Sequence, residues 1–418
     1  MKREKRYGAR RRVRAIGVFI TAAIGFLWCG SGQAAAQSLT WLGQPGWNFS
    51  GAQGVSADGS TVVGYFSSPT GWRAVRWYNG TMETLSMPEG HEGARAFDVS
   101  ADGAMVVGYT WLPQFQSRAA RWGSALDSLG VQSIARAVSD DGSVTVGAYY
   151  TGQYWRAFRW EGANFAELNL GDAQVSDAFG VSRDGAVIVG SITNTDGQTI
   201  ATRWQHDTPL LLGILPDSYH STATGVSSDG ATVVGYVYDD DVDSPRERAF
   251  RWTAGTEMVL IPNPFGDTSA PYGVTARGRV IVGWAWVAAQ TRRTAFRWTE
   301  TTGMQDLNQL YGDLLATGSY LQSAYDISPN GRYIVGDGYN ATTGRFEAYL
   351  LDTGPQCAPN TGDVDDSGVV DDADLLAVLF VFGSTGDDLG RADVNCDNQI
   401  DDADLLIVLF NFGSCPGC

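Results

Sequence analysis

One pattern of apolar and polar positions returns seven times along residues 38–353. In each unit a first apolar segment ends in Val-Ser or a close variant, the chain turns at Asp-Gly or a variant, and a valine-rich and then an alanine-aromatic segment follow. Short apolar runs bounded by glycine turns predict β-strands rather than helices. Four such strands in a unit of 39 to 53 residues are typical of a propeller blade. The predicted fold class is therefore an all-β, seven-bladed β-propeller.

Three small residues of the unit are constant in all seven copies. The turn glycines are Gly59, Gly103, Gly142, Gly185, Gly230, Gly278 and Gly331. The glycines five residues later, each preceded by valine, are Gly64, Gly108, Gly147, Gly190, Gly235, Gly283 and Gly336. The alanines are Ala74, Ala119, Ala157, Ala201, Ala249, Ala295 and Ala348. Small residues at fixed places predict a close approach of one sheet to the next.

The two ends of the repeat complement each other. The seventh unit ends at residues 349–351 without a fourth strand, whereas residues 38–43 precede the first unit and resemble the fourth strand of the others. A closed ring leaves no open sheet edge. We therefore expect the N-terminal strand to complete the last blade.

The alanine-aromatic segment carries a resemblance to a known repeat. Residues 156–160 read RAFRW, and residues 248–252 read the same. This resembles the HAF family of extracellular repeats, over nearly all of residues 54–351. That family is defined by its repeat and its extracellular occurrence, so the resemblance implies a location but no activity.

Five units also combine a turn aspartate with an arginine that precedes tryptophan. The combinations are Asp58 with Arg76, Asp102 with Arg121, Asp141 with Arg159, Asp184 with Arg203 and Asp229 with Arg251. A buried arginine is costly without a partner. We hypothesise an ion pair within each blade, or shared backbone hydrogen bonds, around this arginine.

The connections at one face of the predicted propeller vary in length, whereas the turns at the other face are short and uniform. Variable loops on a rigid scaffold are where binding is expected. Aromatic rings in these loops can stack on glycans, and the alternative is packing between blades. The candidate residues are Trp72, Trp111, Tyr150, Trp155, Trp284 and Trp286.

No catalytic residue is assigned. The chain has three histidines, and none of them lies in a triad or metal-ligand pattern. His91 stands between Glu89 and Glu92 in a connection between blades. A carbohydrate-active enzyme, a glycoside hydrolase or lyase that uses acidic residues of the loop face, is therefore kept as the alternative to a binding protein.

The N-terminal residues predict export. Residues 1–14 carry eight Lys or Arg, residues 15–28 are apolar, and small residues follow up to position 36. This order is typical of a cleaved signal peptide, and the apolar run is short for a membrane span; a retained anchor is the alternative. Without residues 1–36 the chain has 21 Arg against 45 acids, a net charge of −24. Such a charge argues against nucleic-acid or anionic-membrane partners.

Two similar acidic loops lie near the C-terminus, thirty residues apart. Oxygen ligands at positions 1, 3, 5, 7, 9 and 12 are those that Ca²⁺ takes in a twelve-residue loop. The expected ligands in the first loop are Asp363, Asp365, Ser367, Val369, Asp371 and Asp374. Those in the second are Asp393, Asn395, Asp397, Gln399, Asp401 and Asp404. The sequence thus predicts two EF-hand-type calcium loops and two bound Ca²⁺ ions.

Each loop is followed by the same apolar helix pattern and has Asp at position 12. This resembles type I dockerin modules over about the last 55 residues. The resemblance implies docking onto a cohesin-like protein of a polysaccharide-degrading assembly. Loop positions 10 and 11 contribute to partner choice in that family, and the residues at these positions are Asp372, Ala373, Asp402 and Ala403. A calcium-stabilised C-terminal cap or attachment module is the alternative.

Four cysteines, Cys357, Cys396, Cys415 and Cys418, lie in the same region. In an exported protein they favour disulfides over zinc ligands, and three pairings are open.

These predictions divide the chain into a signal peptide (1–36), a propeller (37–353) and a dockerin-like calcium-binding module (354–418). We expect a secreted, extracellular protein whose propeller is a non-catalytic binding or structural scaffold related to polysaccharides. The C-terminal module would attach it to a cell surface or an extracellular assembly.

Overall fold

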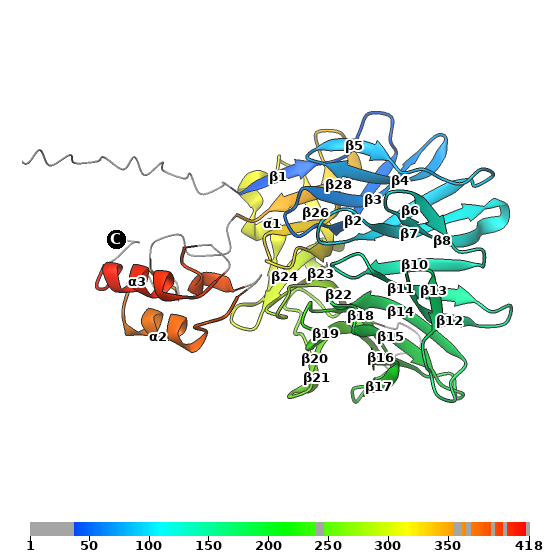
Figure 1. Ribbon diagram of the computed structural model, residues 1–418. Coiled ribbons are helices and arrows are strands. Elements are labelled where there is room, and N and C mark those ends of the chain that lie inside the picture. The colour runs from blue at the N-terminus through cyan, green and yellow to red at the C-terminus, as the bar shows by residue number, and fades with distance from the viewer. Residues whose placement is uncertain are drawn as a thin grey trace, which may run out of the picture. The chain divides into compact units, whose positions relative to one another are not determined.

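The computed structural model describes residues 37–239, 246–354, 362–364, 369–385, 389–395 and 399–414. Within these residues 28 strands form seven four-stranded antiparallel sheets, and successive sheets pack face to face (Figure 1). An apolar cluster joins the seventh sheet to the first. The predicted seven-bladed β-propeller is confirmed.

The strands follow the chain from the centre of each blade outward. Blades one and two are β2 (Phe49–Val55), β3 (Thr61–Ser68), β4 (Gly71–Tyr78), β5 (Thr81–Thr84), β6 (Gly93–Val99), β7 (Val106–Leu112), β8 (Gln116–Trp122) and β9 (Leu126–Ser128). Blades three and four are β10 (Ser133–Val138), β11 (Val144–Tyr150), β12 (Trp155–Glu161), β13 (Asn164–Glu167), β14 (Val175–Val181), β15 (Val187–Thr193), β16 (Thr199–Gln205) and β17 (Thr208–Gly213). Blades five and six are β18 (Ser218–Val226), β19 (Thr232–Asp239), β20 (Glu247–Thr253), β21 (Glu257–Leu260), β22 (Ser269–Val274), β23 (Val280–Val287), β24 (Arg292–Thr299) and β25 (Gly303–Asp306). Blade seven is β26 (Tyr320–Ile327), β27 (Tyr333–Asn340), β28 (Arg345–Asp352) and β1 (Ser38–Trp41).

Blade seven is completed by the N-terminal strand. β1 pairs with β28, with Ser38 opposite Asp352 and Trp41 opposite Tyr349. The expected closure by residues 38–43 is confirmed. Because the first and last strands of the ring belong to one sheet, opening the propeller requires breaking this pairing.

Every inner strand carries a β-bulge at the same place. In blade three the extra residue is Arg136, between Ala135 and Ala137. A Cβ on Gly147 would lie 2.0 Å from the carbonyl oxygen of Ile134 on this inner strand. A Cβ on the equivalent glycine of each of the other six blades would lie 1.9–2.1 Å from the corresponding carbonyl oxygen of its own blade. Glycine is therefore required by the bulge within each blade, and the expected sheet-on-sheet approach at this position is wrong.

The constant alanine lies at the interface between blades, and all seven copies are fully buried. The Ala157 N–H donates to the Ser176 hydroxyl of the next blade at 2.9 Å. Five of the seven interfaces have this bond, and its acceptors are Ser50, Ser133, Ser176, Ser221 and Ser269. Here the small residue does allow close approach of two sheets.

The apolar core is divided around the ring. Each of the seven interfaces between neighbouring blades has its own apolar cluster. The tryptophan of the alanine-aromatic segment anchors it: the Trp204 indole N–H donates to the Asn169 carbonyl at 2.6 Å, and Trp77 donates to Leu42 at 3.1 Å. Each tryptophan thus combines apolar burial with a hydrogen bond to a connecting segment.

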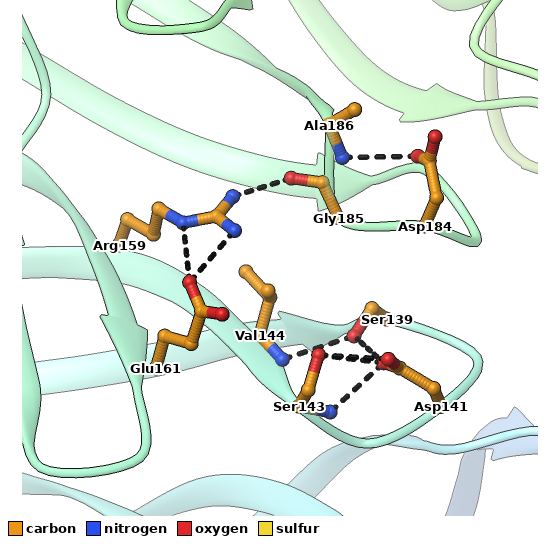
Figure 2. Close-up of polar contacts among 9 residues, drawn as sticks. All are labelled: Ser139, Asp141, Ser143, Val144, Arg159, Glu161, Asp184, Gly185 and Ala186. Carbon is orange, nitrogen blue, oxygen red and sulfur yellow. Dashed lines mark hydrogen bonds and ion pairs between the residues drawn. The ribbon is translucent and has the colours of Figure 1, made fainter.

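The turn aspartate and the arginine before tryptophan have separate partners in blade three (Figure 2). Asp141 Oδ1 accepts a hydrogen bond from Ser139 Oγ at 2.6 Å and one from a backbone N–H of its own turn at 2.9 Å. Arg159 pairs with Glu161 at 2.9 Å and donates to the Gly185 carbonyl of the next blade. The hypothesised Asp–Arg ion pair is wrong, because the short turn satisfies the carboxylate locally. The arginine's backbone hydrogen bond forms, but across the interface.

Helices are few in the described part of the chain. They are α1 (Leu307–Leu310), α2 (Asp372–Phe380) and α3 (Asp402–Asn411), with short 3₁₀ turns η1 (Pro113–Phe115), η2 (Ala288–Gln290), η3 (Gly312–Leu314) and η4 (Gly390–Ala392). None of the described helices is long and apolar enough to cross a membrane. The predicted signal peptide, residues 1–36, lies outside the described residues, as do all four C-terminal cysteines.

Candidate functional site

The bulges turn one side chain per blade toward the centre of the ring, where these side chains line a cavity of about 480 Å³. The seven residues are Gln53, Phe97, Arg136, Phe179, Thr224, Tyr272 and Tyr325. Sequence reasoning missed this set. The available indication was that these positions, two residues before the apolar-Ser or apolar-Thr pair that leads into each turn, differ from blade to blade, whereas the residue before each of them is alanine in six of the seven blades.

Backbone hydrogen bonds link the inner strands beside the turns. The Ala57 N–H donates to the Ala101 carbonyl at 3.0 Å, and the Ala101 N–H donates to the Asp140 carbonyl at 2.9 Å. Similar bonds continue from blade to blade as far as the Pro329 carbonyl, with the donor one residue later, at Asp229, in blade five. Pro329 has no N–H to donate, so this chain of bonds stops at the interface between blades seven and one.

Two aspartates line the cavity immediately after the bulged residue, where four of the other blades have glycine and one has alanine. Asp98 accepts the next N–H of its own strand at 2.7 Å and the Val138 N–H of blade three at 2.8 Å. Asp326 accepts the next N–H of its strand at 2.8 Å and the Val55 N–H of blade one at 2.9 Å. Asp326 therefore joins the one interface that Pro329 leaves without a backbone bond.

Enclosure in the cavity wall raises the pKa of both carboxyls. Desolvation raises the pKa of Asp326 to about 7, against the lowering effect of its two N–H donors. Desolvation also raises the pKa of Asp98 well above its usual value, and the charge of Asp326 adds to this shift. The nearby Asp140 raises the pKa of both. Like charges in one cavity wall resist simultaneous ionisation, which adds to the rise in pKa that desolvation causes.

The arginines that line the cavity have acidic partners. Arg136 makes two hydrogen bonds to Asp177, at 3.0 and 2.8 Å, and its guanidinium lies 4.6 Å from the Phe179 ring centre. Arg183 Nε lies 3.5 Å from an Asp140 oxygen. Their positive charges are thus matched within the propeller.

A further carboxyl, Asp337 on β27, lies beside a tyrosine that lines the cavity. Asp337 is 1 % exposed, and burial raises its pKa to about 6, while the Tyr325 and Ser323 hydroxyls and the Arg293 charge lower it. Gln322 Nε2 lies 3.4 Å from Oδ2, and Oδ1 has no hydrogen-bond partner among the described residues.

Two of the six aromatic residues predicted for a ligand face are buried. Trp111 is 8 % exposed and Trp284 is 3 % exposed. The Trp284 indole N–H donates to the Tyr272 hydroxyl at 3.3 Å, and the Arg293 guanidinium lies 3.8 Å from its ring centre. These two side chains are therefore packed inside the propeller, which was the alternative to glycan stacking in the sequence analysis.

The other four aromatic residues are more accessible. Trp72 is half-buried under the Arg95 guanidinium, 4.3 Å from the ring centre. Tyr150 and Trp155 contact each other, with ring centres 5.7 Å apart, and Trp286 is 37 % exposed. Blades one, three and six contribute these rings, so the structure does not gather the predicted set into one patch.

The two C-terminal loops have matching hydrogen bonds. Asp374, which is fully buried, accepts the backbone N–H groups of Val364 at 2.5 Å and Asp371 at 2.8 Å. Asp404 is equally buried and has the same two bonds in the second loop, at 2.7 and 2.9 Å. The residues at position 1, Asp363 and Asp393, are 6 % and 4 % exposed. Acidic side chains are thus enclosed at equivalent places in both loops.

The two halves of this region also interlock. Val370 of the first loop exchanges backbone hydrogen bonds of 3.0 and 2.8 Å with the segment that follows α3. Ile400 of the second loop exchanges bonds of 2.9 and 2.8 Å with the segment that follows α2. Both side chains are buried in one apolar cluster with Val378 and Val408 of the helices.

The remaining predicted site residues of this region are distributed as follows. Asp365, Ser367 and Asp397 lie outside the described residues. Among those described, no three His, Cys, Asp or Glu side chains come together as ligands of one ion. Asp372 and Ala373 at the start of α2, and Asp402 and Ala403 at the start of α3, are exposed.

Proteins of known structure resemble this chain in the propeller fold. No protein-family model matches the chain, and no curated protein matches it in sequence. The oligogalacturonate lyase of Vibrio parahaemolyticus is similar in structure, with a TM-score of 0.52, 11 % identity and coverage of 75 % of this chain and 93 % of the lyase. The β-propeller domain of the trilobed protease of Pyrococcus furiosus, described as having an open velcro topology, has a TM-score of 0.52, 10 % identity and coverage of 73 % and 96 %. At this identity the likeness concerns the fold alone.

Proposed function

We propose that this chain is a secreted, calcium-binding protein whose propeller is a non-catalytic binding or structural scaffold. A dockerin-like C-terminal module attaches it to a cohesin-like or other protein of a cell surface or extracellular assembly. The HAF-type repeat and the N-terminal segment support an extracellular location, and the strongly acidic composition suits a cation-rich exterior.

The observation that carries the calcium proposal is the duplicated enclosure of Asp374 and Asp404. A carboxylate without water is costly unless N–H donors or a cation compensate it. Each of these aspartates accepts N–H bonds from positions 2 and 9 of its loop, and the position-1 aspartate of each loop is buried as well. The donor set is all oxygen, which suits a hard cation such as Ca²⁺. Bound Ca²⁺ would offset the repulsion among these carboxylates.

The attachment surface is the exposed start of both helices. Asp372 and Ala373 recur as Asp402 and Ala403, so the module presents the same partner-binding pair twice. Phe380 and Phe410, at equivalent places on the two helices, add apolar surface, because each is 84 % exposed. The duplication supports docking in two orientations.

Calcium titration of the chain without residues 1–36 tests this proposal. Isothermal titration calorimetry should give two Ca²⁺ per chain, and Asp374→Asn and Asp404→Asn should each remove one. Asp372→Asn, at an exposed position that lacks a ligand role, is the matched control and should leave two. A chain that takes up no calcium, or a double Asp374→Asn/Asp404→Asn variant that still binds two ions, would contradict the proposal.

A carbohydrate-active enzyme is the second candidate, and Asp337 is the observation that favours it. A carboxyl with a pKa of about 6 suits general acid catalysis of glycoside cleavage. However, Asp337 is 1 % exposed, so a substrate does not reach it without rearrangement of the surrounding tyrosines. The scaffold is therefore preferred. Release of reducing sugar from acidic polysaccharides, lost in Asp337→Asn, would reverse this preference.

A further inference from the structure

The two aspartates in the cavity wall, Asp98 and Asp326, lie on either side of blade one. Asp326 Oδ2 accepts the Val55 N–H at 2.9 Å. A Cβ on the adjacent Gly54 would lie 2.9 Å from the Asp98 Cα. The two carboxyls thus flank neighbouring residues of one strand, β2, and their charges influence each other.

No cationic side chain of the described chain pairs with either carboxyl. Their hydrogen-bond donors are backbone N–H groups, two for each carboxyl. The cavity arginines, Arg136 and Arg183, are engaged with Asp177 and Asp140. The wall formed by blades seven, one and two therefore holds two partly buried acidic groups that no cationic side chain of the described residues pairs with. Ionising both carboxyls side by side without a counter-charge is costly, and a cationic ligand would offset that cost.

Aromatic side chains surround the same cavity. Phe97 and Tyr325, in the two blades that carry the aspartates, line it, and Phe179, Tyr236 and Tyr272 line it from the other side of the ring. The face of an aromatic ring attracts a cation that has lost its water. Carboxyls on one wall and rings around them are complementary to an ion that carries both positive charge and apolar surface.

Other ligand classes fit this cavity less well. A bare metal ion needs several free oxygen ligands, whereas both oxygens of each carboxyl already accept an N–H, and no three metal-ligand side chains of the described residues converge. A neutral sugar would not offset the cost of ionising the two carboxyls. The volume of about 480 Å³ is in the range of small-molecule sites.

We propose that the central cavity of the propeller binds a small organic cation of the ammonium type, with Asp98 and Asp326 as its ion-pair partners and Phe97 and Tyr325 packed against its apolar part. The proposal rests on the binding role of the propeller and makes that role specific. It does not involve the C-terminal calcium loops.

A matched pair of probes tests the proposal in the chain without residues 1–36. Choline carries a quaternary ammonium, and 3,3-dimethylbutan-1-ol has the same shape without the charge. Isothermal titration calorimetry should show one choline bound per chain. The alcohol should bind at least about tenfold more weakly than choline. Asp98→Asn and Asp326→Asn should each weaken choline binding about tenfold, and the exposed Asp172→Asn should leave it unchanged.

A third variant guards against loss of folding, because both aspartates also hold blade interfaces. Phe97→Leu removes a ring but no hydrogen bond, and it should weaken choline about fivefold without changing the circular dichroism spectrum. Equal affinity for choline and the alcohol, no binding of either, or full affinity in all three variants would overturn the proposal. Calcium titration of the same samples separates this outcome from failure of the proposed calcium-binding function, since the two sites share no residue.

Discussion

In every blade the glycine opposite the bulge and the buried alanine stay the same, whereas the bulged residue of the inner strand changes from one blade to the next. The constant residues serve the packing of the sheets: a Cβ on Gly147 would lie 2.0 Å from a carbonyl oxygen, and the Ala157 N–H donates to the Ser176 hydroxyl of the next blade. The bulged residues line the central cavity instead. In a ring of repeats, uniform positions therefore identify the scaffold, and the position where uniformity fails identifies the site.

The largest effect should come from filling the space opposite a bulge. Gly147→Val places its Cβ 2.0 Å from the Ile134 carbonyl, which cannot move without disrupting the blade. We expect a loss of about 3 kcal/mol or more in unfolding free energy, measured by urea denaturation. Gln53→Ala at a bulge should change it by less than about 0.5 kcal/mol. Comparable losses of unfolding free energy in the two variants would contradict the distinction between scaffold positions and cavity positions.

The pH dependence of stability should distinguish the two kinds of aspartate. Asp326 has a raised pKa of about 7, so its folded form holds a proton that the unfolded chain releases near 3.8. The stabilisation of the folded state by this proton is fully present below pH 3.8 and is lost as the pH rises through 7. The turn aspartate Asp141 has a lowered pKa because of its bond from Ser139, so its contribution is present above 3.8 and is lost as the pH falls through its folded pKa.

Urea denaturation between pH 4 and 8 measures this difference. The wild type should lose stability with a slope of up to about 1.4 kcal/mol per pH unit, and Asp326→Asn should reduce that slope. The charged groups around Asp326 are Asp98 and Asp140, and Arg183 also lines the cavity. An Asp326→Asn variant with an unchanged slope would show that the carboxyl ionises normally.

A smaller effect is expected at the serines between blades. Ser176→Ala leaves the buried Ala157 N–H without its acceptor, which should cost about 1 to 3 kcal/mol in thermal or urea unfolding. Ser124→Ala, at an exposed position, is the control and should stay within about 0.5 kcal/mol. Equal stability of the two variants would mean that this bond is not part of the scaffold.

The smallest expected effect is the energetic coupling between Asp141 and Arg159, which should be close to zero. Because Asp141 bonds within its turn and Arg159 bonds to Glu161 and the next blade, Asp141→Ala and Arg159→Met should be additive. A double-mutant cycle should give an interaction energy below about 0.5 kcal/mol. A larger coupling would restore the ion pair that the sequence suggested. Figure 2 shows the two separate sets of bonds.

The fold could be predicted from the sequence because the same weak pattern occurs seven times. One Val-Ser-x-Asp-Gly segment predicts little, but seven copies predict strands, turns and blade number together. The closing strand followed from counting, since the seventh unit lacks a fourth strand. The cavity residues did not follow. The direction of the side chains of Gln53 and Arg136 depends on a one-residue bulge, which alternation of apolar and polar residues does not reveal.

The sequence alone determined the number of blades, the strand that closes the ring and the acidic loops near the C-terminus, because each is written in local patterns that repeat. Only the tertiary structure decided which constant residues bond to one another. Asp141 and Arg159 recur together along the chain, yet the turn satisfies one and the next blade the other. The close position of Asp98 and Asp326 was likewise decided by ring closure, which brings blades seven, one and two together across more than two hundred residues.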